Sequence, residues 1–177
     1  KAKPGELNYG STSTGSSNHL AAELFKSLAG VNMVRVNYKG NAEALVDLIG
    51  GSLQVMFPST GVVAPHVKAG KVRALAVTSP RPSTLAPGLP TVAASGLPGY
   101  ESGAIYAILG PARTPALLVN RLNLEIVRVL KQPEISETLF KTGIEVIGSS
   151  PQQLGATMKS EIARMGKVIK DAGIRAE

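Results

Sequence analysis

The first 80 residues alternate between two hydrophobic periods. Four short apolar runs predict β-strands, at residues 7–10, 33–38, 53–57 and 72–78. Apolar residues between and after these runs recur every three or four positions and predict three helices, from about Ser17 to Gly30, Ala42 to Gly50 and Ser59 to Gly70. Such alternation, at a spacing of roughly 20 residues, is typical of βαβ units. It predicts an α/β fold with a mostly parallel sheet and helices on both faces.

Beyond residue 80 the helical signals dominate. Residues 80–99 contain five prolines and predict an ordered, turn-rich connection. An apolar run at 103–109 then predicts a crossing strand, and a shorter strand signal lies at 145–147. Helices are predicted from about Pro115, Pro133 and Pro151, because proline suits the first turn of a helix.

The two long helices of this second half carry apolar stripes. The members of the stripes are Leu118, Leu122, Ile126, Val129 and Leu130 in one helix and Leu154, Met158, Ile162, Met165 and Ile169 in the other. Too few strand signals accompany them to supply a covering sheet. We expect a preceding segment or a second copy of the chain to cover the stripes, and self-association of the chain through them. Residues 1–5 resemble a linker inside a longer protein, which fits this expectation.

A loop of small polar residues joins the first predicted strand to the first predicted helix. Its members are Ser11, Thr12, Ser13, Thr14, Gly15 and Ser16. Small side chains leave backbone N–H groups uncovered, and the following helix begins with unpaired N–H groups and a partial positive charge. This combination predicts a site for a carboxylate or phosphate. The alternative is a serine-rich turn that ends in an ordinary N-cap at Ser16 or Ser17.

Two known loop motifs are incomplete here. Gly10 and Gly15 have the spacing of the phosphate loop G-x-x-x-x-G-K-[ST], but Ser16 stands where the motif requires lysine. The nucleophile motif G-x-S-x-G is absent from this loop. A carboxylate held by neutral donors therefore fits this loop better than a nucleotide.

Two further loops are expected beside the first. In parallel α/β sheets, ligands bind where the carboxyl ends of strands lead into helices. The loops after the second and third strands meet this condition, and their candidate ligand-binding residues are Tyr38, Lys39, Gly40, Pro58 and Ser59.

Several single residues are interpreted as structural and not as ligand-binding. His19 fits a cap or packing role better than a ligand contact, and Asn41 is the expected cap of the second helix. Glu23 and Glu43 are expected on solvated helix faces. The same second helix is expected to bury the apolar side chains of Leu45, Leu48 and Ile49.

Composition excludes several functional classes. The chain has 177 residues, a net charge of +7, 4% aromatic residues and no cysteine. Its basic residues are scattered and lie beside few aromatics, which argues against nucleic-acid binding. No carboxylate pair, Ser-His-Asp set or metal-binding cluster is evident, so we expect no enzyme activity, no cofactor and no metal. No apolar run is long enough for a membrane span.

An ordered set of motifs along the whole chain resembles the Bug-type (TctC-like) receptors of tripartite tricarboxylate transporters. The motifs are YGS at 9–11, S-x-x-HL at 16–20, V-x-YKG at 36–40, VMF at 55–57, KAGKVRALAVT at 68–78, PTV at 90–92 and GLPGYE at 96–101. Each motif is weak alone, whereas their order is specific.

The resemblance implies a periplasmic solute-binding receptor with the two-lobed, type II periplasmic-binding-protein fold. Residues 1–98 would form the second lobe, and residues 99–177 a crossing strand and helices that complete a first lobe otherwise missing from this chain. The receptor would capture a small carboxylate for the membrane subunits of the transporter. Where many relatives have Asp after VMF, this chain has Pro58, which argues against an amino-acid ligand. The alternative function is a sensing module of the same fold that passes carboxylate occupancy to a signalling partner.

Overall fold

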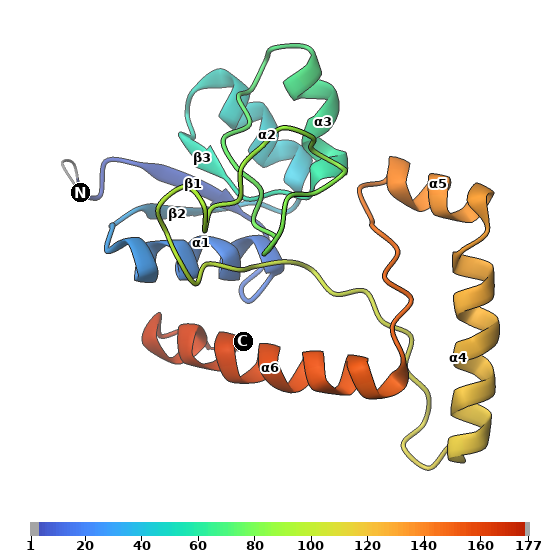
Figure 1. Ribbon diagram of the computed structural model, residues 1–177. Helices are drawn as coiled ribbons and strands as arrows, with labels where there is room; N and C mark the ends of the chain where they lie inside the picture. Colours follow the sequence, from blue (N-terminus) through green and yellow to red (C-terminus); the bar gives the residue numbers. More distant parts are fainter. Residues whose placement is uncertain (1–3, 176–177) are drawn as a thin grey trace. The chain divides into compact units, whose positions relative to one another are not determined.

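The computed structural model describes residues 4–175 and divides them into two compact units (Figure 1). The first unit comprises residues up to 104 together with those from 165 onward, and the second comprises residues 105–164. Residues 1–3, part of the predicted linker, lie outside the described residues. The predicted border at residues 98–99 concerns the lobes of a whole receptor and stays a prediction.

A three-stranded parallel sheet organises the first unit. Its strands are β1 (Asn8–Ser11), β2 (Val34–Asn37) and β3 (Val55–Met56), in the spatial order β2-β1-β3. Helices α1 (Ser17–Ala29), α2 (Asn41–Gly50) and α3 (Thr60–Lys68) connect and follow these strands. The prediction of parallel βαβ units is therefore confirmed, with β1 in the centre.

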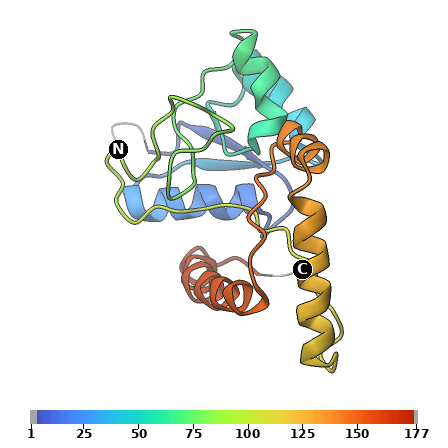
Figure 2. The ribbon, with the colours of Figure 1, turned by 45° about the vertical axis from the view of Figure 1, so that its right-hand side comes forward.

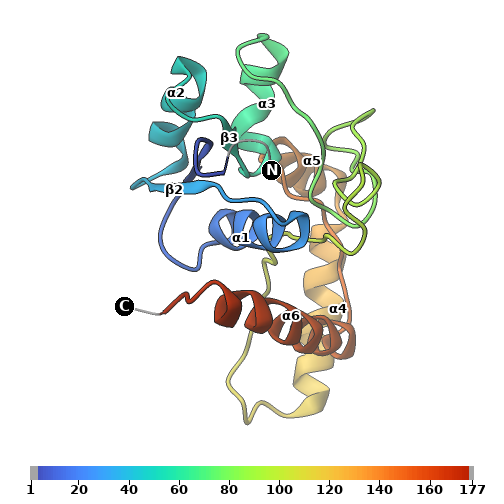
Figure 3. The same ribbon diagram turned by 90° about the vertical axis from the view of Figure 1, so that its left-hand side faces the viewer.

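Helices α1 and α2 cover opposite faces of this sheet (Figure 3). Adjacent strand residues point to opposite faces. Tyr9 packs with Ala22 of α1, whereas a Cβ on Gly10 would lie 2.6 Å from Leu53 Cδ1 and 3.2 Å from Ala44 Cβ of α2. Glycine at position 10 thus allows α2 to approach the central strand closely.

The core lies mainly on the α1 face. Tyr9, Ala22 and Met33 form one buried cluster, and Leu24, Tyr100 and Val168 form a second. The Phe25 ring contacts both clusters, and its centroid lies 6.1 Å from that of Tyr100 in an edge-to-face arrangement. Tyr100 also donates a hydrogen bond of 3.0 Å to the Ala21 carbonyl. The start of the second half of the chain is thereby anchored to α1.

The predicted helix ends are largely confirmed. Ser16 is the N-cap residue of α1, without a capping hydrogen bond from its side chain, and Gly30 and Gly51 end α1 and α2 in the left-handed conformation that favours glycine. Two predictions about α2 were wrong. Gly40, and not Asn41, is its N-cap residue. Leu45 is buried and Leu48 is half-buried, in the direction predicted, whereas Ile49 is 39% exposed.

Three predicted strands are absent from the described residues. In place of a strand at 72–78, a single parallel bridge joins Val77 to Thr91, within the proline-rich connection. The crossing strand at 103–109 and the strand at 145–147 have no pairing partner within residues 4–175, and both segments are irregular. An apolar run forms a strand only where another strand can complete its hydrogen bonds.

The second unit contains α4 (Ala116–Leu130), α5 (Pro133–Lys141) and the first part of α6 (Pro151–Asp171). Figure 2 shows α5 following the end of α4 after a short turn. Asn123 of α4 donates a hydrogen bond of 2.9 Å to the Ser149 carbonyl just before α6. Among the described residues, no helix combines the length and apolar character that a membrane crossing requires.

Candidate functional site

The predicted site residues 11–16 lie at the carboxyl edge of the sheet. Ser11 ends β1 and is fully buried, whereas Ser13, Thr14 and Gly15 are exposed at the turn before α1. The Tyr38 N–H donates a hydrogen bond of 2.9 Å to the Ser11 carbonyl. The first two predicted loops are therefore neighbours, as the parallel topology requires.

Asn18 connects these two loops through its side chain. Its Oδ1 accepts hydrogen bonds from the Thr12 N–H at 3.4 Å, the Thr12 hydroxyl at 3.2 Å and the Ser16 hydroxyl at 2.5 Å. Its Nδ2 donates to Asn41 Oδ1 at 2.9 Å, at the start of α2. Asn18 is 6% exposed, so these bonds form away from most of the solvent. The buried Asn18 amide thus links Thr12 and Ser16 of the loop to the start of α2.

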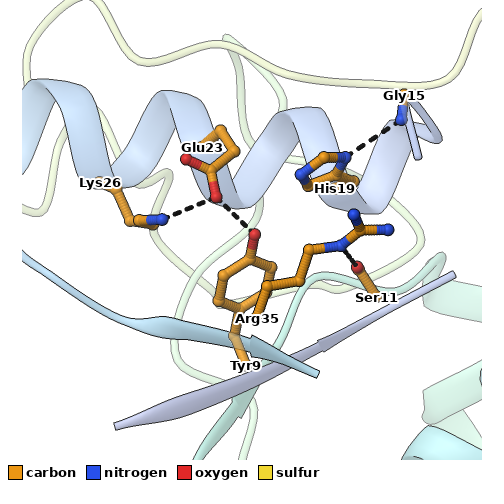
Figure 4. A network of polar contacts seen from close by, with 7 residues as sticks. All are labelled: Tyr9, Ser11, Gly15, His19, Glu23, Lys26 and Arg35. Carbon is orange, nitrogen blue, oxygen red and sulfur yellow. Dashed lines mark hydrogen bonds and ion pairs between the residues drawn. The ribbon is translucent and has the colours of Figure 1, made fainter. Parts of the chain in front are cut away.

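His19 closes the turn from the other side (Figure 4). Its Nδ1 accepts a hydrogen bond of 3.1 Å from the Gly15 N–H, and Gly15 adopts the positive φ of 76° that favours glycine. An accepting Nδ1 carries no proton, so His19 is neutral in this arrangement. Burial, and secondly the charge of Arg35, lower the pKa of His19 below its usual value. The expected cap role of His19 is confirmed.

Arg35 brings a positive charge to the loop, which the sequence interpretation omitted. It lies in β2, and its Nε donates to Ser11 Oγ at 2.7 Å (Figure 4). Its Nη2 donates to the Thr12 carbonyl at 2.6 Å, and its Nη1 to Thr14 Oγ1 at 3.2 Å. The expected set of purely neutral donors was therefore incomplete. The available signal was that Arg35 is the one charged residue in the first two predicted strands.

Several donors of the loop remain unused. Among residues 4–175, the N–H groups of Ser13 and Thr14 and those of the first three residues of α1 have no hydrogen-bonding partner. The Ser13 hydroxyl also has none within this range. The hydroxyls of Thr12 and Ser16, in contrast, already donate to Asn18. The donors that an anion could use are thus concentrated at Ser13, Thr14 and the first turn of α1.

The turn after β2 is ordered by its own acidic partners. The Tyr38 hydroxyl donates to Asp47 Oδ2 at 2.6 Å, and this bond raises the pKa of Tyr38 to about 12. The Lys39 N–H donates to Glu43 Oε2 at 3.3 Å, while the Lys39 side chain is exposed. Gly40 caps α2. The proton of the Tyr38 hydroxyl is therefore already committed within the chain.

Pro58 and Ser59 lie between β3 and α3. Ser59 is the N-cap residue of α3, and its carbonyl accepts a hydrogen bond of 3.1 Å from the Val62 N–H. Within the described part of the chain, no hydrogen bond joins either residue to the loop at 11–16. Their predicted role in ligand binding stays a prediction.

Glu23 is a correction to the sequence interpretation, which placed it on a solvated face. Its Oε1 accepts a hydrogen bond of 2.5 Å from the Tyr9 hydroxyl and pairs with Lys26 at 2.7 Å, and its side chain is 12% exposed (Figure 4). Burial, and secondly this hydrogen bond, raise the pKa of Tyr9. The helical pattern missed Glu23 because the buried residue that it meets, Tyr9, carries a polar tip.

Other candidate centres are weak. An open hollow follows α3, lined by Val67, Gly70, Lys71, Val72, Arg73, Ala74 and Leu89, and it includes none of the predicted site residues. In residues 4–175, no group of three or more His, Asp or Glu side chains is placed to hold a metal ion.

Comparison with known proteins assigns the family. Residues 1–174 match the family described as "Tripartite tricarboxylate transporter family receptor". The chain belongs to this family. It is 31% identical to protein BugT of Bordetella pertussis over 99% of this chain and 54% of that protein. The chain spans about half the length of most curated relatives that it matches.

Solved structures share the fold, among them the periplasmic binding protein BugD, which matches with a TM-score of 0.74 and 27% identity over 99% of this chain and 60% of that one. An R. palustris protein, Rpa4515 with adipate, matches with a TM-score of 0.81 and 38% identity, over 98% of this chain and 58% of that one. MatC of Rhodopseudomonas palustris with bound malate matches with a TM-score of 0.71 and 26% identity, over 93% and 57%. The α/β fold of the periplasmic solute-binding type is thus confirmed for this chain.

Proposed function

We propose that the full-length protein is a periplasmic solute-binding receptor that captures a small carboxylate for the membrane subunits of a tripartite tricarboxylate transporter. The observation that carries this proposal is the set of unused donors at Ser13, Thr14 and the first turn of α1. These groups have no hydrogen-bond acceptor among residues 4–175, and the partial charge at the start of α1 favours an anion. The adipate and malate named for two structural relatives support a carboxylate ligand.

Reversible binding, and not catalysis, suits this arrangement. Three titratable groups near the loop are committed to internal partners: His19 to Gly15, Tyr38 to Asp47 and Glu23 to Lys26. None of these pairs combines a nucleophile with a base. We propose that the loop holds a ligand carboxylate by hydrogen bonds from N–H and hydroxyl groups, each contributing about 1.5–3 kcal/mol to a charged acceptor.

Calorimetric titration of the full-length protein with adipate and malate tests the proposal. The Ser13→Ala/Thr14→Val double variant removes two hydroxyl donors, and we expect it to weaken binding of the better ligand by roughly tenfold or more. The matched control is Ser27→Ala/Ser52→Ala, which removes two exposed hydroxyls outside the loop. Equal affinity in all three proteins would place the ligand elsewhere. Absence of binding to any small di- or tricarboxylate would contradict the proposed function.

A further inference from the structure

Arg35 is held beside the loop with part of its binding capacity unused. A guanidinium group has five N–H donors. Four of them are engaged: one with Ser11, one with Thr12, one with Thr14 and one with Asn37 Oδ1 at 2.9 Å. Among the described residues, the second N–H of Nη1 has no acceptor. The Nη1 atom that carries it bonds to Thr14, one of the exposed loop residues.

The charge of Arg35 is also unbalanced. All four of its acceptors are neutral oxygens, and within residues 4–175 it forms no ion pair with a carboxylate. Glu23 is the acid on the neighbouring face of α1, and it is already paired with Lys26. His19 is neutral and adds no negative charge. Because Arg35 is partly buried, water screens this charge less than it would screen an exposed one.

We infer that Arg35 is the residue that makes the site select an ionised carboxylate over a neutral polar group. This inference rests on the proposed function. Backbone N–H and hydroxyl donors already bind a carboxylate more strongly than a primary amide, because hydrogen bonds to a charged acceptor are stronger than those to a neutral one. The fixed positive charge of Arg35 adds a preference that these neutral donors do not supply, because its Coulombic attraction acts on the carboxylate charge and not on the amide. Its four neutral acceptors hold the guanidinium in place and leave the charge available to the ligand.

A purely structural role is the competing explanation, since Arg35 also ties Ser11, Thr12 and Thr14 together. The two roles differ in what they change. Loss of the hydrogen bonds that Arg35 donates loosens the loop and weakens the binding of every ligand by a similar factor. Loss of the positive charge weakens the binding of the carboxylate and leaves the binding of the amide almost unaffected, so the ratio of the two affinities changes.

The experiment compares adipate with its neutral diamide, adipamide, in the full-length protein. Calorimetry on the wild type, Arg35→Gln and Arg35→Lys gives this ratio, and circular dichroism melting verifies folding. We expect Arg35→Gln to reduce the preference for adipate by roughly tenfold or more, while Arg35→Lys retains most of it. The control is Lys71→Gln, which removes an exposed positive charge outside the loop and should leave the ratio unchanged. Should adipate prove not to be a ligand, malate and its diamide replace the pair.

Salt gives an independent readout. Affinity for adipate should fall with ionic strength in the wild type and show a smaller dependence in Arg35→Gln. An equal loss for adipate and adipamide, with an unchanged salt dependence, would overturn the inference and leave the proposed function standing. A wild type that binds none of the carboxylates would instead refute the proposed function and the inference together. If Arg35→Gln does not fold, two other measurements test the inference. Loss of the preference for adipate over adipamide in Arg35→Lys, or an adipate affinity of the wild type that does not change with ionic strength, would contradict it.

Discussion

Helices α1 and α4 have similar amphipathic patterns, but the apolar face of α1 is buried and that of α4 is largely exposed. In α1, Leu24 is 6% exposed and Ala22 is fully buried, because the sheet and Tyr100 lie against this face. In α4, Leu118 and Leu122 of the predicted stripe are 50% and 48% exposed. The pattern of apolar residues therefore shows which face of a helix requires a partner, and it does not show whether the chain itself supplies one.

The largest expected effect contrasts one leucine from each helix. Leu24→Ala should lower the free energy of unfolding of the 177-residue chain by about 2–5 kcal/mol, because it leaves a cavity between Tyr100 and Val168. Leu122→Ala should cost about 1 kcal/mol or less, because half of that side chain already contacts water. Urea denaturation followed by circular dichroism measures both.

A similar loss for the two variants would break the comparison, because it would mean that the α4 face is covered in solution. Sedimentation velocity then shows whether a second copy of the chain covers this face. In that case we expect the chain to self-associate through the α4 and α6 stripes, and Leu122→Gln to shift it toward the monomer. Suppose instead that the wild type is monomeric at all concentrations and that Leu122→Ala still loses as much unfolding free energy as Leu24→Ala. That result would contradict the exposed state of α4.

The next effect concerns two tyrosines. Tyr9→Phe removes the hydroxyl that donates to Glu23 in the interior, and it should destabilise the chain by about 1.5–3 kcal/mol because the acceptor is a charged carboxylate. Tyr106 is 75% exposed, and Tyr106→Phe should change stability by less than about 0.5 kcal/mol. Thermal melting provides the measurement. If Tyr9→Phe is as neutral as Tyr106→Phe, Lys26 alone satisfies Glu23, and the buried network is not a source of stability.

The contrast between the units also explains how far the sequence predicts the fold. Strands β1, β2 and β3 and helices α1, α2 and α3 follow from hydrophobic period and from their caps, since local signals and the sheet agree there. Helices α4, α5 and α6 follow from local signals alone. The predicted strands at 72–78, 103–109 and 145–147 fail because pairing is a non-local property. The composition of these segments is suitable for strands, but no neighbouring strand among the described residues completes their hydrogen bonds.

For the site, the sequence identifies the loop but not the groups that shape it. A run of Gly, Ser and Thr before a helix is a local signal, and Ser13 and Thr14 do present free donors. Asn18 and Arg35 escape such reasoning because their partners are remote: Asn41 is 23 residues from Asn18, and Ser11 is 24 residues from Arg35. The pairing of β1 with β2 brings Arg35 beside Ser11, and the starts of α1 and α2, which follow these strands, place Asn18 beside Asn41.

The smallest expected effect is the pH dependence of the loop. The folded-state pKa of His19 lies below its value in the unfolded chain, about 6.5, because of burial and then the charges of Arg35 and Lys26, with Glu23 acting in the opposite direction. Between the two pKa values the unfolded chain binds the extra proton. The contribution of His19 to stability is therefore complete above about pH 6.5, falls as the pH drops toward the folded-state pKa, and is constant below it.

His19→Asn isolates this contribution, because an amide oxygen can accept the Gly15 N–H bond without titrating. Urea denaturation between pH 7.5 and 5 should show that the wild type loses more stability than His19→Asn as the pH falls. His66→Asn, which removes the chain's other histidine from α3, should retain the wild-type slope. An unchanged slope in His19→Asn would mean that protonation of His19 leaves the Gly15 turn intact. The loop would then be held mainly by Asn18, and its shape should persist in acid.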